Sequence, residues 1–305
     1  MSRTGLTAWI TLAACGWATA MPGQPAGPAG AADHRQEIRA WQERRAQGLR
    51  NQDSWLTLVG LFWLRAGENS FGSGAGSALR LEHDQLPARA GSFWREENRV
   101  RFEAAPKVRV LHDGAPVQSI ALEPDSSAAP TELELGSLSF HVIERAGEYG
   151  VRVKDRRSAA LQSFQGLSYF PIDDAWRVTA RFEPYDPVKK VPILNVTGQR
   201  QELDSPGALV FEIAGQSYRL DPLGGEDGVL FIMFADGTSG KETYGAGRYL
   251  YVPVAENGTT VVDFNKAQNP PCAFTRFATC PLPPPQNRLP IRVTAGEKSY
   301  AGAGH

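Results

Sequence analysis

The sequence predicts a mainly β protein with two β-rich halves, preceded by one helix. Three observations support this fold class. Short apolar runs that alternate with polar residues recur from about residue 57 to residue 265. Glycine and proline are plentiful, with 31 and 22 residues, as expected for many short strands joined by turns. Helical spacing is clear in a single segment, residues 34–51.

The composition is that of an ordinary globular protein with balanced charge. Of its 305 residues, 32 are Lys or Arg and 33 are Asp or Glu, which gives a net charge of −1. Because proteins that bind nucleic acid usually carry a basic stripe, this balance argues against such a partner. The dinucleotide, His-Glu-x-x-His and G-x-S-x-G motifs are absent, and the histidines lack metal-ligand spacing. We therefore expect neither a cofactor nor a metal.

The first residues predict export and a lipid anchor. A basic residue, Arg3, precedes an apolar run that is too short to span a bilayer. This run ends in LAACG (residues 12–16), which resembles the lipobox of bacterial lipoproteins. The resemblance implies cleavage after a signal peptide of residues 1–14, lipidation of Cys15 and attachment to a membrane. A plain secretory signal is the alternative. Residues 15–32 are then a flexible tether, and we expect a cell-envelope lipoprotein, outer-membrane or periplasmic-facing, of a Gram-negative bacterium.

The first folded part is expected to span residues 33–165. Its helix is predicted to begin after an N-cap at Asp33 and to dock through Ile38, Trp41 and Leu49. The strands that follow have the turn pattern of a β-sandwich.

Residues 57–145 resemble a forkhead-associated (FHA) β-sandwich in their turn residues. The stretch LRAGENSFGS (64–73) is similar to its first turn, and Asp113-Gly114 to its late hairpin. The resemblance implies the sandwich fold. The FHA family reads phosphothreonine with an Arg after the Gly of the first turn and a Ser-x-x-His motif. Ser73 takes the place of that Arg and the second motif is absent, so we do not expect phosphopeptide binding.

The second β-rich part is expected to span residues 166–300, as an antiparallel sheet or barrel. AENG joins the runs RYLYVPV and TTVVDFN, and this pattern predicts a hairpin. Because side chains alternate between faces, a hairpin would place Arg248 on the same face as Asp263 and Asn265.

A polar loop, residues 237–247, precedes this hairpin and brings Lys241, Glu242 and Tyr244 near it. These three residues, together with Arg248, Asp263 and Asn265, are the predicted site for a small polar or anionic ligand. Two alternatives remain open. The chain is an envelope hydrolase that uses Glu242 and Asp263 as paired carboxylates, or it is a structural or interaction lipoprotein whose polar cluster only holds the fold.

The C-terminal segment contains Cys272 and Cys280 among prolines. They are 280 − 272 = 8 positions apart, a loop that can close to disulfide distance. In an exported protein these thiols would be oxidised, so we expect a disulfide that closes a proline-rich clasp.

The motif DFN-x-A-x-NPPCAF-x5-CPLPPP-x-NRLP…AGEK (263–298) also carries a family resemblance. Together with GTSGKETYGAGRYL and DSWLTLVGLFWL (53–64), it resembles an uncharacterised bacterial family of unknown function. The resemblance implies no activity.

Overall fold

The computed structural model of the protein describes residues 28–226 and 228–302. The predicted signal peptide, Cys15 and most of the predicted tether lie outside these residues. The helices in the described part are too short or too polar to span a membrane. The expected mainly β fold, with one long helix ahead of several sheets, is confirmed.

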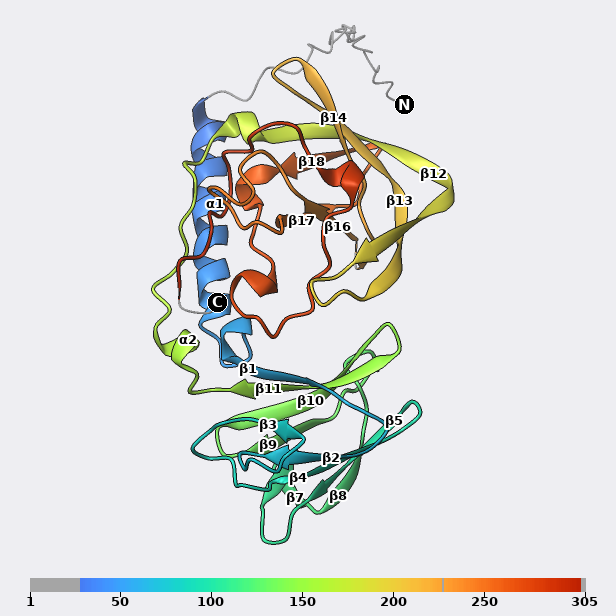
Figure 1. The fold of residues 1–305 in the computed structure, drawn as a ribbon. Helices are drawn as coiled ribbons and strands as arrows, with labels where there is room; N and C mark the ends of the chain where they lie inside the picture. The colour runs from blue at the N-terminus through green and yellow to red at the C-terminus, as the bar shows by residue number, and fades with distance from the viewer. Residues whose placement is uncertain (1–27, 227, 303–305) are drawn as a thin grey trace, which may run out of the picture.

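The long helix α1 (Pro28–Leu49) begins earlier than expected. Pro28 is its first residue, a position at which the missing N–H of proline costs no hydrogen bond. The predicted docking residues Ile38 and Leu49 are fully buried, and Trp41 packs edge-on against Tyr169. Figure 1 shows α1 running beside the sheets of the second half of the chain, although it precedes the first half in sequence.

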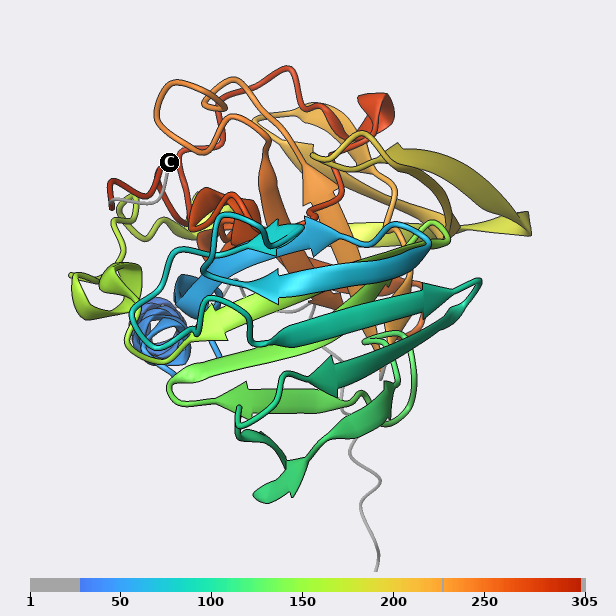
Figure 2. The same ribbon diagram turned by 60° about the horizontal axis from the view of Figure 1, so that its bottom comes forward.

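The N-terminal β part (residues 58–155) is a sandwich of two sheets. One sheet has six strands in the order β1-β11-β10-β9-β6-β7, and the other has five in the order β3-β2-β4-β5-β8. Figure 2, which brings this part forward, shows the strands stacked in layers. The strands are β1 (Leu58–Trp63), β2 (Gly67–Gly72), β3 (Leu79–Arg80), β4 (Gly91–Glu96), β5 (Arg99–Ala104), β6 (Val110–His112), β7 (Ala115–Val117), β8 (Ser119–Leu122), β9 (Glu132–Leu135), β10 (Leu138–Arg145) and β11 (Glu148–Asp155).

Four phenylalanines form the centre of this sandwich. Phe71, Phe93, Phe102 and Phe140 are almost fully buried, and their rings meet at tilted or edge-on angles, which are favourable for aromatic pairs. The predicted turn at Asp113-Gly114 is confirmed between β6 and β7. Both residues have positive φ, as tight hairpins require.

A connector leads from the sandwich to the C-terminal β part (residues 177–263). The connector contains α2 (Ala159–Gln162) and the short helix η2 (Asp174–Trp176). Two sheets follow, with strand orders β14-β13-β12-β18 and β15-β16-β17, and Phe211, Phe234 and Phe264 pack at their centre. The strands are β12 (Arg177–Leu194), β13 (Arg200–Ile213), β14 (Gln216–Leu220), β15 (Gly225–Glu226), β16 (Val229–Phe234), β17 (Arg248–Pro253) and β18 (Thr259–Asp263).

Of the hairpin predicted between residues 248 and 265, the turn is correct but the pairing of the two strands is wrong. Asn257-Gly258 does form a tight turn with positive φ, closed by two hydrogen bonds between Glu256 and Thr259. Past that point β17 pairs with β16 and β18 pairs with β12, so the two strands lie in different sheets. The alternation that predicted a shared face for Arg248 and Asp263 therefore does not apply.

The last segment crosses the C-terminal β part mostly as coil. It contains the short helices η3 (Phe264–Lys266), η4 (Pro271–Ala273) and η5 (Pro285–Asn287). Proline has no backbone N–H to donate, and the side chain of Asn287 makes up part of this deficit. Its amide accepts from the N–H of Asp221 and donates to the carbonyls of Asp221 and Met233.

Candidate functional site: a cleft between the two β parts

The six predicted ligand-binding residues do not come together in one site. Arg248 is fully buried, and its guanidinium pairs with Asp236 at 2.8 Å rather than with Asp263. It also donates to the carbonyls of Val293 and Ala295, so it fixes the C-terminal segment. Burial lowers the pKa of Arg248, against the opposite effect of Asp236. The pairing differs from the prediction because Asp236 lies two residues past the end of β16, the true partner strand of β17.

Asp263 and Asn265 hold the start of helix α1. One oxygen of Asp263 lies 2.7 Å from Nε2 of His34, and the other accepts from the side-chain and backbone nitrogens of Asn265. Nδ1 of His34 lies 2.6 Å from Asp174. This arrangement ties α1 to η2 and β18.

Lys241, Glu242 and Tyr244 lie elsewhere. Glu242 is partly exposed and forms an ion pair with Arg292. The hydroxyl of Tyr244 donates to the carbonyl of Cys272 at 3.0 Å, and Lys241 is exposed. Glu242 and Asp263, the carboxylates of the hydrolase alternative, contact different basic side chains, Arg292 and His34. The six residues line neither of the cavities described below.

The disulfide predicted between Cys272 and Cys280 is not formed, because both residues are buried free thiols. Sγ of Cys280 accepts from the backbone N–H of Cys272 at 3.0 Å. A hydrogen bond between the two sulfurs lowers the pKa of Cys272 and raises that of Cys280. Backbone hydrogen bonds hold the clasp in place of the covalent link: Val196 donates to Cys280 and Leu282 donates to Leu194.

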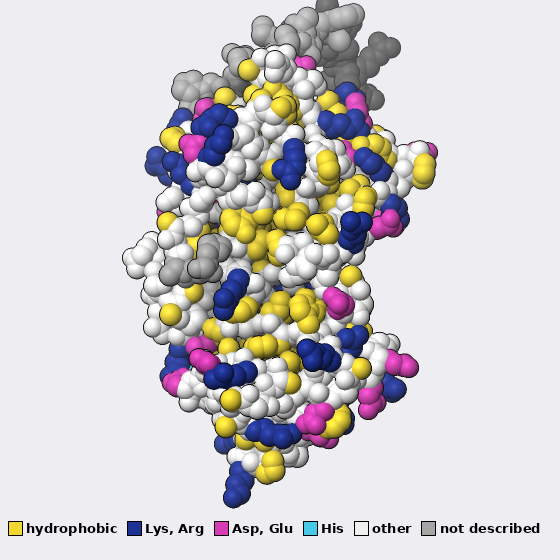
Figure 3. Space-filling model, in the orientation of Figure 1, with side chains coloured by type: hydrophobic (Ala, Val, Ile, Leu, Met, Phe, Trp, Pro, Cys, Tyr) yellow, Lys and Arg dark blue, Asp and Glu magenta, His cyan; other side chains and the backbone are white. Residues whose placement is uncertain are grey.

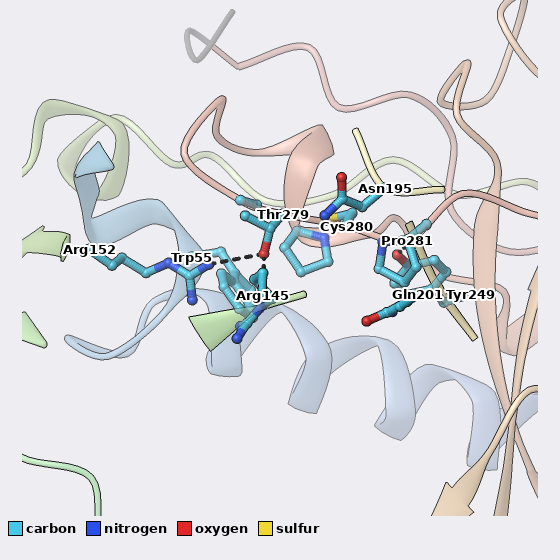
Figure 4. A pocket seen from close by; sticks show the side chains of 11 residues that line it. Trp55, Arg145, Arg152, Asn195, Gln201, Tyr249, Thr279, Cys280 and Pro281 are labelled. Carbon is cyan, nitrogen blue, oxygen red and sulfur yellow. Dashed lines mark hydrogen bonds between the residues drawn. The ribbon is translucent and has the colours of Figure 1, made fainter. Parts of the chain in front are cut away.

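A cavity of about 220 Å³, hereafter the cleft, lies where the two β parts meet. Figure 3 shows apolar side chains gathered across the middle of the molecule between the two parts, and Figure 4 shows the cleft from close by. The N-terminal side contributes Trp55, Arg145 and Arg152. The C-terminal side contributes Asn195, Gln201, Tyr249, Pro271, Ala278, Thr279, Cys280 and Pro281.

Arg152 on β11 is the most unusual residue of the cleft. Its side chain is only 5% exposed, yet no carboxylate of the described residues lies within ion-pair distance of it. Its Nη2 donates to Oγ1 of Thr279 at 3.4 Å, and its guanidinium lies over the ring of Trp55 at 5.7 Å. Burial, followed by the nearby positive charge of Arg145, lowers the pKa of Arg152 to about 10. It therefore stays charged at neutral pH.

Arg145, the second guanidinium of the cleft, is already neutralised. It forms two hydrogen bonds with Asp125, at 2.9 and 2.7 Å, the forked geometry that makes arginine–carboxylate pairs strong. Its Nε donates to Oγ1 of Thr279 at 3.1 Å. Figure 4 shows both guanidinium groups converging on this hydroxyl. The cleft thus contains one compensated positive charge and one uncompensated one.

The main residues of the cleft were not predicted from the sequence, although the segments that contain Trp55 and Thr279 carry recognisable motifs. Trp55 lies in DSWLTLVGLFWL, and Thr279 lies between the two cysteines. Arg152 alternates with the buried Val151 and Val153, so it points away from the sandwich core. The sequence therefore did carry a signal for the cleft. Arg152 and Lys154 alternate with apolar residues, so they lie on a sheet face that either solvent or another part of the chain must cover.

Comparison with known proteins identifies a family without an assigned activity. Residues 162–298 match the family described as "Protein of unknown function (DUF1684)". No curated protein matches the chain. The solution NMR structure of an uncharacterized protein from gene locus rrnAC0354 of Haloarcula marismortui is 32% identical. That match covers 45% of this chain and 78% of the other, with a TM-score of 0.39.

FHA domains are also among the similar solved structures. One is the FhaA FHA domain complexed with the intracellular domain of Rv3910, which is 17% identical. It covers 30% of this chain and 96% of its own, with a TM-score of 0.22. Another comes from a study of phosphothreonine-dependent FHA domain interactions and is 18% identical. It covers 32% of this chain and 96% of its own, with a TM-score of 0.23. The resemblances predicted from the sequence, to a family of unknown function and to FHA domains, are both confirmed.

Proposed function

Since the chain belongs to the DUF1684 family of proteins of unknown function, we propose its function from the cleft: it binds a small organic anion between its two β parts. The proposed ligand belongs to the class predicted from the sequence, but its binding site is at Arg152 and not at the loop of residues 237–247.

The observation that carries this proposal is the buried, uncompensated charge of Arg152. Removing an ion from water costs several kcal/mol even after the protein relaxes, and a buried arginine is normally paired. Among the described residues, the only side-chain acceptor that Arg152 contacts is the neutral hydroxyl of Thr279, and Arg145 donates to the same oxygen. A carboxylate or other anion in the cleft would offset the cost with a charge-assisted hydrogen bond.

The remaining lining suits a ligand with an apolar or planar body. The ring of Trp55 is 37% exposed and Gln201 brings an exposed amide. Pro271, Ala278 and Pro281 supply apolar surface. At about 220 Å³ the cleft is smaller than the roughly 300–1,000 Å³ of sites for drug-sized ligands. We therefore infer a small metabolite rather than a peptide or polysaccharide.

Calorimetry with small carboxylates tests this proposal. Succinate, citrate and benzoate should be titrated at constant ionic strength, with chloride as the comparison anion. At least one should bind the wild-type protein, and Arg152→Met should weaken that binding by tenfold or more because it removes the charge. Thr279→Val removes only the hydroxyl and should weaken binding less.

Arg156→Met is the matched control, since this arginine is more than one-third exposed, pairs with Glu134 and does not line the cleft. Binding that is equal in wild type and Arg152→Met would refute the proposal. So would the absence of binding by every carboxylate tested.

We also propose that the protein works at the cell envelope, attached through Cys15. The support is the lipobox-like sequence of residues 12–16. Cys15→Ser should release the protein from the membrane fraction, and a variant that stays membrane-bound would rule out lipid attachment at this residue.

A further inference from the structure

A second, smaller cavity lies on the same sheet face as the cleft and shares Arg152 and Trp55 with it. Its volume is about 180 Å³. The lining comes from the segment before β1 and from strands β1, β10 and β11, and consists of Asp53, Ser54, Trp55, Leu58, His141, Arg152 and Lys154. No residue of the cysteine-containing segment takes part.

Three polar atoms of this lining are buried and lack hydrogen-bond partners. They are Oγ of Ser54, Nδ1 of His141 and Nε of Arg152. Ser54 is 9% exposed and Arg152 is 5% exposed. Buried polar atoms are almost always satisfied in folded proteins, so three unsatisfied ones around one cavity indicate a missing partner.

The fold brings these atoms together from positions far apart in the sequence. His141 on β10 and Arg152 on β11 are directly opposite each other in the antiparallel pair, so their side chains share one face. Ser54 precedes the short helix η1 (Trp55–Thr57), and its hydroxyl makes no capping hydrogen bond there. Its own carbonyl accepts from the Thr57 hydroxyl, which fixes the backbone of Ser54.

The charge around the cavity is positive. Nζ of Lys154 lies 3.7 Å from Asp53, whose side chain is 77% exposed, so Asp53 offsets little of the charge. Burial, Arg152 and Lys154 lower the pKa of His141 to about 4, against weaker opposite effects of Glu132 and Asp125. The imidazole is therefore neutral at neutral pH and can donate one hydrogen bond.

We propose that this second cavity binds a tetrahedral oxyanion, phosphate or sulfate, on Ser54, His141, Arg152 and Lys154. A hydroxyl, an imidazole, a guanidinium and an ammonium are four separate donors. They suit an anion whose oxygens point in several directions better than a flat carboxylate. The inference goes beyond the function proposed for the cleft, because it assigns a different class of anion to a separate cavity.

Thermal shift assays and calorimetry with inorganic phosphate test the inference. Phosphate and sulfate should raise the melting temperature of the wild-type protein more than chloride does at equal ionic strength. Ser54→Ala should weaken phosphate binding roughly tenfold, since it removes a donor to a charged group. Arg152→Met should abolish binding.

Ser139→Ala is the matched control, since Ser139 lies opposite Lys154 on β10 but lines neither cavity. If Ser54→Ala does not fold, His141→Gln serves as the second variant. A change in the Nδ1 chemical shift of His141 on addition of phosphate gives a direct readout. No shift at Nδ1, or phosphate binding that is unchanged in Ser54→Ala and Arg152→Met, overturns the inference.

The two proposals fail separately. Thr279→Val alters only the cleft and should leave phosphate binding unchanged, whereas Ser54→Ala should leave carboxylate binding unchanged. Carboxylate binding without phosphate binding therefore removes only this inference.

Discussion

The guanidinium of Arg152 lies 3.4 Å from the hydroxyl oxygen of Thr279, and this contact joins the two β parts of the protein. Arg152 belongs to the face of the six-stranded sheet that points away from the sandwich core. Thr279 belongs to the loop between the two cysteines, which folds over that face. The contact buries a positive charge and pairs it only with a neutral hydroxyl. Arg152 therefore lines both the cleft and the second cavity.

Arg152→Met is expected to stabilise the unliganded protein. The substitution removes a buried charge without a carboxylate partner and replaces it with an apolar side chain of similar length. Replacing even a buried ion pair by apolar residues is often neutral or stabilising by about 1–4 kcal/mol, and Arg152 has, within the described part of the chain, no carboxylate partner whose attraction would be lost. Urea denaturation should show a higher midpoint with an unchanged slope, while Arg156→Met should stay within about 0.5 kcal/mol of wild type. Marked destabilisation by Arg152→Met would mean that its apolar stem and its bond to Thr279 outweigh the cost of the buried charge.

Asp236→Asn is expected to destabilise the protein strongly. It removes the carboxylate partner of Arg248, which is fully buried. Breaking a buried pair by removing one partner typically costs about 3–5 kcal/mol. Glu242→Gln breaks the partly exposed pair with Arg292 and should cost at most about 1 kcal/mol. Denaturation curves of the two variants measure this contrast, and equal losses would contradict the assignment of Arg248 as a structural residue.

The fold class and the turns could be predicted from the sequence because they depend on local signals. Asp113-Gly114 is an example, since both residues have positive φ here and these two residue types adopt such a conformation more readily than most others. The partner of Arg248 could not be predicted, because it depends on which strand lies beside β17. Side chains do alternate between the two faces of each strand, but β17 and β18 do not pair, so this alternation does not place Arg248 beside Asp263.

The cleft could not be predicted from the sequence either. In the strand 148–155, Arg152 has the pattern of an ordinary outward-facing polar residue. It is buried because Trp55 and Thr279, from distant parts of the chain, fold against it. Alternation separates the two faces of a strand, but it does not tell whether solvent or another part of the chain covers the outer face.

Cys272 and Cys280 are expected to react only when the protein unfolds. Both thiols are buried and unlinked, so a thiol reagent should modify them slowly in the native state. In a Cys15→Ser variant, which leaves only these cysteines, two thiols should become reactive on addition of guanidinium chloride without reductant. An intact mass lower by two hydrogens than the reduced sequence would show a disulfide and contradict the structure.

The attachment of helix α1 is expected to weaken as the pH rises. Burial lowers the pKa of His34, but its hydrogen bonds to Asp263 and Asp174 outweigh this effect and raise the pKa above 6.5, against a smaller opposite effect of Arg177. A group whose pKa is raised on folding stabilises the protein fully below its unfolded pKa and loses this contribution as pH rises through the folded value. The stabilisation should therefore be complete below about pH 6.5 and decline above it.

The experiment compares the wild-type protein with His34→Gln between pH 5.5 and 8.5. The difference in melting temperature between the two should shrink over this range as His34 loses its proton. Hydrogen exchange should show the first turns of α1 opening before the sheets do, because Asp263 and Asp174 then hold only a neutral imidazole. A difference that stays constant with pH would mean that His34 is neutral in the folded protein, with one of its carboxylate partners holding the proton instead.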